Sequence, residues 1–383
     1  MNPVYFDNAA TSFPKAPGVA ESIVNYITNI GCNVNRGAYA SALQAQRVLF
    51  DTRNLICSFF NFNNPENVVF TKNITESLNV LIKGLLKPGD HVIVSSMEHN
   101  AVMRPLTSMT ERSSVEFSRV PCSIDGTLNI EDLNKYLKPN TRAVIMTHAS
   151  NVCGTILPLK QVGEFCKKND LYFIIDSAQT AGFLDLDFKA LNAHAIAFTG
   201  HKALLGPQGM GGFIIHPDLV PLVDTFIEGG TGSLSSSEKQ PDYMPDKFES
   251  GTMNIPGIFG LNASLNYLKT TGIDSIREKE LYLTEIFVNK VKNMDNIRLI
   301  GLDGIENRTA VVSLDFTGSD NAEVSFKLSN DYSILNRCGL HCAPSAHKTL
   351  NTYPQGTVRF SFSHNNTVEE INYAVDCIYK CLK

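Results

Sequence analysis

The chain has 383 residues and a formal net charge of −5. This length exceeds what a single hydrophobic core usually supports, so it predicts two domains. The weak negative charge gives no electrostatic footprint for nucleic acid or for an anionic membrane. No signal peptide and no apolar stretch long enough to cross a bilayer are visible. We therefore expect no nucleic-acid partner and no membrane association.

Nine cysteines are spread along the chain, and none of them forms a C-x-x-C pair. An odd number of cysteines without the spacing of metal ligands is typical of reduced thiols in a reducing compartment. The pattern predicts a cytoplasmic protein without a bound metal.

Apolar runs alternate with helical patterns over the first two thirds of the chain, and this predicts βα units around a mostly parallel sheet. We place this larger α/β domain at residues 16–258 and a smaller α/β domain at 259–383. The smaller domain is expected to contain helical segments within 258–268 and 276–292 and strands at 311–316 and 357–361.

Five apolar runs of the larger domain each lead into polar residues. Ligands of open α/β sheets bind outside the carboxyl ends of such strands. The run 68–70 leads to Thr75, where backbone N–H groups and a hydroxyl at a helix start would either hold a phosphate or only cap the helix. The run 92–95 leads to His99, which either stacks on a cofactor ring or caps the following helix.

The next two runs carry an amide and a carboxylate. Residues 143–147 lead to Asn151, and residues 171–175 end in Asp176. A carboxylate there would pair with the pyridine nitrogen of a cofactor and keep the ring an electron sink. Its alternative role is the N-cap of the next helix.

The run 195–198 is followed by Thr199, His201 and Lys202. A lysine amine condenses with an aldehyde cofactor as a Schiff base, and the hydroxyl and imidazole before it would bind the phosphate of that cofactor. A lysine at a strand end is otherwise a solvated surface residue. Because all five polar groups follow strand ends, we predict that they form one site.

These residues resemble a known family. Five short motifs occur in an order that is similar to that of the cysteine desulfurase and selenocysteine lyase family, which are class V aminotransferases of the pyridoxal-phosphate (PLP) dependent fold type I. The motifs are Thr75-Glu76, Glu98-His99-Asn100, Ser150-Asn151, Asp176-Ser177-Ala178-Gln179 and Gly200-His201-Lys202. The likeness extends from residues 5–10 through 248–252 to 359–363. It implies a homodimer of the α/β fold type I, in which an N-terminal arm, residues 1–15, joins the smaller domain.

The resemblance also implies roles for single residues around the cofactor. Lys202 would form the Schiff base, Asp176 would pair with the pyridinium nitrogen, His99 would stack on the ring, and Gln179 would contact its phenolic oxygen. The phosphate would be held by Thr75, Thr199 and His201, by Thr252 of the second subunit, and by the backbone alone at Ile74, where the family often has a hydroxyl.

The substrate would be held by arginines and an amide. By the same resemblance Asn151 and Arg359 would bind the substrate carboxylate, because a planar guanidinium grips both oxygens, and Arg337 would assist. The segment from Arg337 to Cys342 resembles the family's Arg-x-Gly-x-x-Cys loop. On that match Cys342 attacks the substrate sulfur as a thiolate, which cationic neighbours such as Arg337 and His341 would favour.

Two segments depart from the family pattern or lack an assigned role. Residues 344–350 do not match the best-characterised desulfurases, and His347 within them is either a second acid or base near the thiol or a surface or capping residue. The polar segment 229–241 is either a substrate-covering loop or an ordinary loop.

The sequence therefore predicts a cysteine desulfurase that converts L-cysteine to L-alanine and holds the sulfur on Cys342 as a persulfide. The short cysteine loop is compatible with a dedicated acceptor protein, which no residue of the chain identifies. L-selenocysteine is the alternative substrate, because one pocket would admit either chalcogen. Another class V reaction, such as Cβ–S lysis, would need Lys202 but not Cys342. A non-catalytic binding scaffold of the same fold is disfavoured by the intact Lys202, Asp176 and His99.

Overall fold

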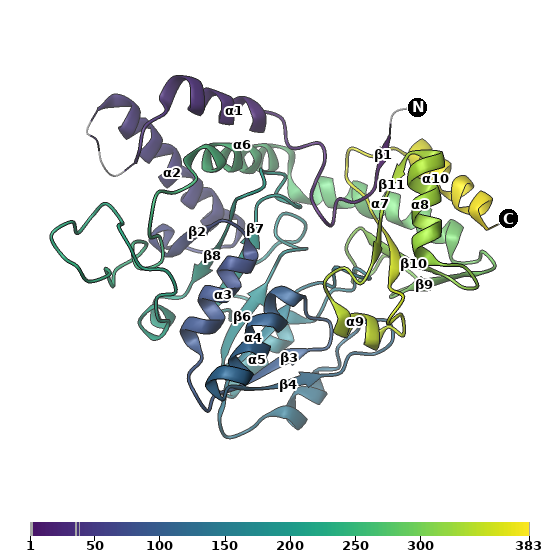
Figure 1. Ribbon diagram of the computed structural model, residues 1–383, viewed down its shortest axis with the longest axis horizontal. Helices are drawn as coiled ribbons and strands as arrows, with labels where there is room; N and C mark the ends of the chain where they lie inside the picture. The colour runs from purple at the N-terminus through teal and green to yellow at the C-terminus, as the bar shows by residue number, and fades with distance from the viewer. Residues whose placement is uncertain (1–2, 35–36, 38, 383) are drawn as a thin grey trace.

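The computed structural model describes residues 3–34, 37 and 39–382, and it forms a larger and a smaller lobe (Figure 1). The larger lobe contains a seven-stranded sheet in the order β2-β8-β7-β6-β5-β3-β4. Neighbouring strands from β4 to β7 run parallel, whereas β8 is antiparallel to β2 and β7. The predicted mostly parallel sheet is confirmed. Its strands are β2 (Val68–Thr71), β3 (His91–Ser95), β4 (Glu116–Val120), β5 (Thr141–Thr147), β6 (Tyr172–Asp176), β7 (Ala195–Thr199) and β8 (Gly211–Ile215).

Helices cover both faces of this sheet, and the strand residues alternate between two apolar cores. On β6, Phe173 and Ile175 pack into one core, and Ile174 packs into the other. Side chains of a strand point alternately to opposite faces, so a strand covered on both sides reads as a continuous apolar run. The first core includes α1 (Val19–Asn25), α2 (Ala40–Phe59), α5 (Leu159–Lys168) and α6 (Ile255–Thr271), and the second includes α3 (Ile74–Leu85) and α4 (Asn100–Ser113).

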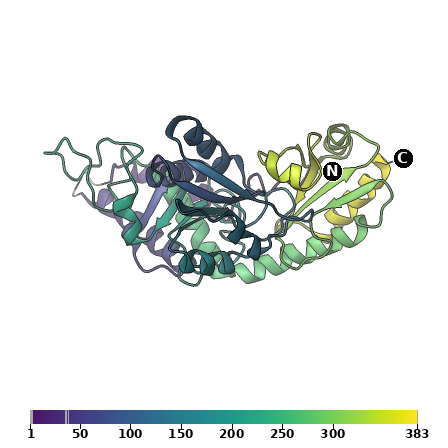
Figure 2. The same ribbon diagram turned by 90° about the horizontal axis from the view of Figure 1, so that it is seen from below.

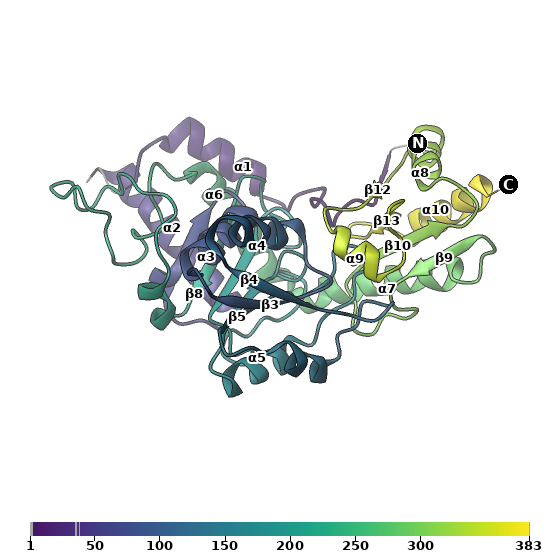
Figure 3. The same cartoon turned by 60° about the horizontal axis from the view of Figure 1, so that its bottom comes forward.

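The smaller lobe is built on an antiparallel sheet in the order β12-β13-β10-β9. In Figure 2 the helical stretch of α6 and α7 runs from the larger lobe to the smaller one. Figures 1 and 3 place α9 on the side of the smaller lobe that faces the larger lobe. The elements are β9 (Ile297–Ile300), β10 (Val311–Phe316), β12 (Arg337–Gly339), β13 (Thr357–Ser361), α7 (Ile273–Val291), α8 (Asn321–Tyr332), α9 (Pro344–Thr349) and α10 (Val368–Cys381).

The N-terminal segment is attached to the smaller lobe. Strand β1 (Val4–Tyr5) pairs in parallel with β11 (Ile334–Leu335), and Phe6 is buried in the core of that lobe. The expected boundary at 258/259 falls inside α6, whose apolar residues pack in the larger lobe. We therefore propose Gly272, between α6 and α7, as the boundary, with the arm assigned to the smaller lobe.

One surface segment stands out from the larger lobe. Residues 229–241 are mostly exposed and lie in turns and bends. In Figure 1 this segment extends from the larger lobe on the side away from the smaller lobe. Over residues 3–34, 37 and 39–382, no helix has the length and apolar character needed to span a membrane.

The packing of α5 gives a test of this fold. A Cβ atom on Gly163 would lie 1.9 Å from the backbone oxygen of Leu191. Although alanine is the better helix former by about 1 kcal/mol, we expect Gly163→Ala to lower the free energy of unfolding by about 1–3 kcal/mol because backbone must move. Urea unfolding would measure this. The exposed neighbour Glu164 is the control, and Glu164→Ala should change stability by no more than about 0.5 kcal/mol; equal stability of both variants would contradict this packing.

Candidate active site

The carboxyl ends of four parallel strands lie at one edge of the central sheet, and polar residues from each gather there. The turn after β3 carries His99, the turn after β5 carries Asn151, β6 ends in Asp176, and Lys202 follows β7. The charges of Lys202, Arg337 and Arg359 all influence the pKa of His99. The structure therefore brings the smaller lobe's arginines to the strand ends of the larger lobe.

Lys202 and Asp176 form the centre of this site. Lys202 is half-buried, and burial lowers the pKa of its ammonium to about 8, while the nearby Asp176 carboxylate acts in the opposite direction. Asp176 is only 2% exposed, and burial raises its pKa, against the effects of the Ala178 N–H and of Lys202. Residues 178–180 form a turn, so the Asp176 carboxylate caps a turn and not a helix.

The backbone beside Lys202 is held by the N-terminal segment. The carbonyl oxygen of His201 accepts hydrogen bonds from the Ser12 N–H at 2.9 Å and from the side chains of Thr11, Ser12 and Lys15 at 3.1, 3.2 and 3.0 Å. These donors come from a segment almost 190 residues away along the chain. The position of the Lys202 loop therefore depends on the arm.

His99 both caps a helix and enters the site. Its Nδ1 accepts the N–H of Ala101 at 3.0 Å in the first turn of α4. Burial, followed by the charge of Lys202, lowers its pKa to about 4. The ring is therefore neutral at pH 7 and has Nδ1 as its acceptor.

The residue before His99 is a buried carboxyl group. Glu98 accepts a hydrogen bond from the Ser95 hydroxyl at 2.5 Å and from the Thr147 N–H at 2.9 Å. Burial raises its pKa to about 8. Because Ser95 ends β3 and Thr147 ends β5, Glu98 ties the two strand ends together and orients the His99 turn.

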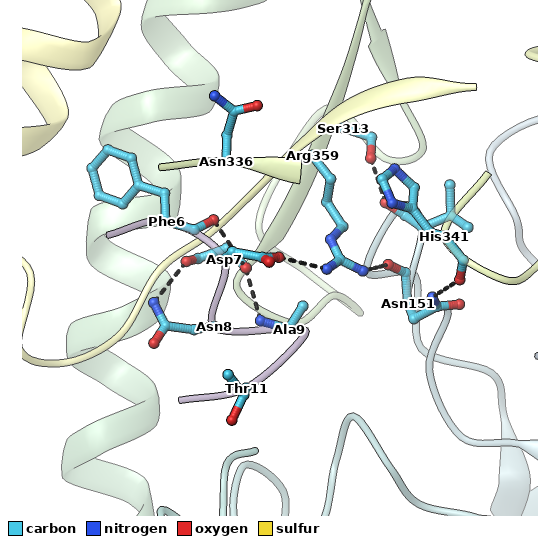
Figure 4. Close-up of polar contacts among 12 residues, drawn as sticks. Phe6, Asp7, Asn8, Ala9, Thr11, Asn151, Ser313, Asn336, His341 and Arg359 are labelled. Atoms are coloured by element: carbon cyan, nitrogen blue, oxygen red, sulfur yellow. Dashed lines mark hydrogen bonds and ion pairs between the residues drawn. The ribbon is translucent and has the colours of Figure 1, made fainter. Parts of the chain in front are cut away.

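Arg359 lies where the arm, β13 and the end of β5 meet (Figure 4). It is 1% exposed. Its Nη2 pairs with Asp7 at 2.8 Å, and its Nη1 donates to the carbonyl oxygen of Asn151 at 3.0 Å. The Asn151 side-chain amide donates instead to the carbonyl oxygen of His341 at 2.7 Å. The two residues expected to hold a carboxylate are thus adjacent and linked to the loop that carries Cys342.

The Cys342 loop reaches from the smaller lobe to the strand ends. The Cys342 side chain is exposed. The backbone carbonyl oxygen of Cys342 accepts the N–H of Asn100, the residue after His99, at 2.8 Å. His341 and Cys342 both have left-handed backbone conformations, with φ of 48° and 58°. Such conformations cost energy for residues with a Cβ and persist where surrounding contacts hold them. The loop therefore presents the thiol in a defined position.

Arg337 and Cys338 begin this loop on β12, and His347 follows it on α9. His347 is fully buried, and its Nδ1 bonds to the Thr352 hydroxyl at 2.7 Å, so the alternative of a surface position is wrong. Arg337 on β12 lies opposite Arg359 on β13 in the antiparallel register of these two strands. Burial raises the pKa of Cys338, which makes it a poorer nucleophile.

The comparisons with known proteins decide the family. Residues 4–373 match the family model described as aminotransferase class-V. The chain belongs to this family.

Relatives and solved structures of similar fold carry consistent names. A probable cysteine desulfurase of Methanothermobacter thermautotrophicus is 33% identical, over 96% of this chain and 92% of the relative. The apo structure of a cysteine desulfurase from Thermococcus onnurineus NA1 has a TM-score of 0.93 at 29% identity, over 99% of this chain and 94% of that one. An Escherichia coli cysteine desulfurase has a TM-score of 0.89 at 25% identity, with the same coverage. The predicted family and fold type are confirmed.

Class V aminotransferases generally depend on PLP, and the polar groups near Lys202 fit such a cofactor. Thr199 Oγ1 and His201 Nδ1 are buried and have no hydrogen-bond partner in the described part of the chain. Buried polar atoms are almost always paired, so each of these two atoms needs an explanation. The phosphate oxygens of PLP would pair with both atoms, and Asp176 would offer a carboxylate to its ring nitrogen.

The start of α3 lies at the same edge. A Cβ on Gly211 would be 2.8 Å from the Asn73 backbone, and Gly211 pairs with Thr199 between β8 and β7. The absence of a side chain there lets the first turn of α3 approach Thr199. This turn contains the buried Ile74 and the exposed Thr75, and a helix N-terminus attracts anions.

Of the two remaining residues expected to contact the cofactor, Gln179 lies at the site and Thr252 does not. Gln179 donates to the carbonyl oxygen of Ala9 at 3.2 Å, so it lies beside the arm at the site. Thr252 is exposed and lines a separate cavity with Lys72 and Glu76. Within this single chain Thr252 is not among the groups that gather around Lys202.

Three residues to which the sequence assigned no role support the site: Asp7, Lys15 and Glu98. Asp7 lies in the segment 5–10 that carries part of the family resemblance, and Glu98 precedes His99 in a quoted motif. The positions of Asp7 and Glu98 within these motifs could have marked both residues as part of the site. The sequence did not reveal which residues they contact. In the described residues no group of three or more His, Cys, Asp or Glu is arranged to hold a metal ion.

The pKa of Lys202 gives a test. Only the neutral amine attacks an aldehyde, so labelling of the cofactor-free protein by pyridoxal and a mild hydride reductant should rise with pH and level off above about 8. In Asp176→Asn the midpoint should move to lower pH, because that carboxylate raises the pKa of Lys202. Peptide mass spectrometry would measure the labelling, with the exposed Lys348 as internal control. A Lys202 profile that still rises near the ordinary lysine pKa of about 10.4 would contradict this assignment.

Proposed function

We propose that this protein is a PLP-dependent cysteine desulfurase that converts L-cysteine to L-alanine and holds the removed sulfur as a persulfide on Cys342. The observation that carries the proposal is the anchoring of the Cys342 loop. Its backbone is bonded to Asn100 beside His99 and to Asn151 beside Arg359. An exposed thiol is thereby tied to the strand ends that surround Lys202.

The cofactor would be held by groups from several elements. Lys202 would bind its aldehyde carbon, Asp176 its ring nitrogen, and Gln179 its phenolic oxygen, with the neutral His99 ring against its face. Its phosphate would lie with Thr199, His201 and the first turn of α3, which contains Ile74 and Thr75. When bound, PLP supplies an electron sink that makes the Cα proton of an amino acid acidic.

The chain's own groups account for binding and proton transfer. Arg359 and Arg337 place two positive charges where a substrate carboxylate would bind, and Asn151 lies beside them. Lys202, whose pKa is about 8, is available as a neutral amine near neutral pH to remove the Cα proton. It becomes an ammonium in the presence of the buried Asp176 carboxylate.

The sulfur step consumes only the substrate and one thiol. The Sγ of Cys342, as a thiolate, attacks the sulfur of L-cysteine, so that an S–S bond forms and the Cβ–S bond breaks. The electron pair of the broken bond stays with Cβ, which takes up a proton. L-cysteine and a thiol thus become L-alanine and a persulfide without an external oxidant. Holding the thiol near the substrate is the main contribution of the loop.

A homodimer would complete the site. Thr252 and the segment 229–241 lie on the larger lobe away from the smaller lobe, and Phe50 and Phe226, which line cavities with Thr252, are 53% and 46% exposed. Exposed apolar side chains that cluster mark protein interfaces. We propose that a second subunit covers this surface and receives Thr252 at its phosphate site.

The sulfur acceptor and the compartment follow from the same proposal. Because Cys342 is exposed, a dedicated acceptor protein would reach its persulfide. The nine free cysteines support a reducing, cytoplasmic location.

Alanine formation tests this function. With L-cysteine and a thiol reductant, the PLP-loaded protein should form L-alanine, and Cys342→Ala should lower the rate by about 100-fold or more because the positioned nucleophile is lost. Cys338→Ala in the same loop should retain activity. PLP absorbance would verify that both variants bind the cofactor.

The substrate L-selenocysteine separates the alternatives. Loss of activity with L-cysteine but not with L-selenocysteine in Cys342→Ala would still assign the persulfide to Cys342. An unimpaired rate from L-cysteine in Cys342→Ala would exclude the persulfide role, and alanine from L-selenocysteine alone in the wild type would assign a selenocysteine lyase.

A further inference from the structure

Residues 7–15, here called the N-terminal strap, contact three separate parts of the site. Asp7 pairs with Arg359, and the carbonyl oxygen of Ala9 accepts the Gln179 amide. The side chains of Thr11, Ser12 and Lys15 donate to the His201 carbonyl oxygen. Only the first of these contacts is an ion pair with a residue expected to bind substrate.

Asp7 is the counter-charge of a buried cation. Burial lowers the pKa of Arg359, and the nearby Arg337 adds to this effect, whereas Asp7 raises it by charge and by hydrogen bonding. A buried cation without a partner is costly. The Arg359 side chain is 1% exposed and the Asp7 side chain is 22% exposed. Asp7 therefore neutralises Arg359 while keeping a route to water.

The contact uses only part of the guanidinium. Asp7 Oδ1 accepts from Nη2 at 2.8 Å, and the Nε of Arg359 is buried without a partner in the described part of the chain. The Nε–H and one Nη2–H of an arginine point in the same direction and together grip the two oxygens of one carboxylate. A substrate carboxylate bound in this way needs the Nη2 donor that Asp7 holds.

We propose that Asp7 is a placeholder for the substrate carboxylate. It pairs with Arg359 in the free enzyme, gives up Nη2 to the incoming amino acid, and returns when L-alanine leaves. Asp7 is thus a positioning residue that sets the affinity for substrate and product alike. The inference rests on the role of Arg359 in the proposed function.

The strap stays attached without this ion pair. The Ala9 N–H donates to the Ser361 hydroxyl at 2.8 Å, the Asn8 amide donates to the Ser361 carbonyl oxygen at 2.9 Å, and the Ser361 N–H donates to the Phe6 carbonyl oxygen at 2.7 Å. These bonds fix both neighbours of Asp7 to β13. Asp7→Asn therefore removes a charge and leaves the backbone of the strap in place.

The test compares two ligands that differ by one carboxylate. L-alanine and ethylamine are titrated into PLP-loaded wild type and Asp7→Asn, and binding is followed by the absorbance of the cofactor. We expect the variant to bind L-alanine roughly tenfold more tightly, as for loss of one competing ion pair, with ethylamine affinity unchanged. KM for L-cysteine should fall and kcat should not rise, because L-alanine leaves more slowly. If the role of Asp7 were merely structural, Asp7→Asn would change the affinities for L-alanine and for ethylamine by the same factor.

Control variants separate the possible failures. Asp274→Asn removes an equal charge from a surface pair with Arg277, 2.9 Å apart, and should change neither affinity. Arg359→Gln should lower the affinity for L-alanine but not the affinity for ethylamine. If the affinity for L-alanine does not fall, the carboxylate role of Arg359 is overturned. If Arg359→Gln lowers the affinity for L-alanine, but Asp7→Asn leaves that affinity unchanged or lower, only the placeholder role of Asp7 is overturned. Asp7→Ser, which also removes the charge, replaces Asp7→Asn if that variant does not bind PLP.

Discussion

The guanidinium of Arg359 places a positive charge in a position almost without water, and the surroundings of the site follow from the need to compensate it. Its partners come from distant parts of the chain: Asp7 from the arm and the carbonyl oxygen of Asn151 from the end of β5. Asn151 in turn holds the backbone of the loop that carries Cys342. One buried cation therefore joins the arm, the larger lobe and the Cys342 loop of the smaller lobe.

Burial also prepares the titratable groups for chemistry. It lowers the pKa of Lys202 and of His99 and raises that of Asp176, because a low-dielectric surrounding disfavours every charged form. A lysine that is partly neutral near pH 7, a neutral imidazole and a carboxylate kept close to a cation are the groups that the proposed PLP chemistry would use. The same surroundings leave Thr199 and His201 with buried polar atoms that a phosphate would satisfy.

Much of the fold was predictable because the central strands are covered on both faces and therefore appear as continuous apolar runs. The runs before His99, Asn151, Asp176 and Lys202 are β3, β5, β6 and β7, with ends that differ by no more than two residues. Strand β4 was not predicted because its residues are partly exposed, and β8 was not predicted because it begins with Gly211 and a second glycine. For His347 the sequence left open a role as acid or base near the thiol and a surface or capping position, since a polar side chain does not reveal its burial.

By itself the sequence determined the order of the strands' polar ends, the family and the identity of the residues expected to bind cofactor and substrate. This was possible because each signal is local: an apolar run followed by a lysine, a carboxylate or an amide. The tertiary structure alone decided which groups support them. Asp7 and Arg359 are 352 residues apart in the chain, and Lys15 meets the His201 carbonyl across 186 residues. No local pattern encodes such pairs, because the packing of two lobes and an arm brings them together and excludes the water that would otherwise solvate their charges.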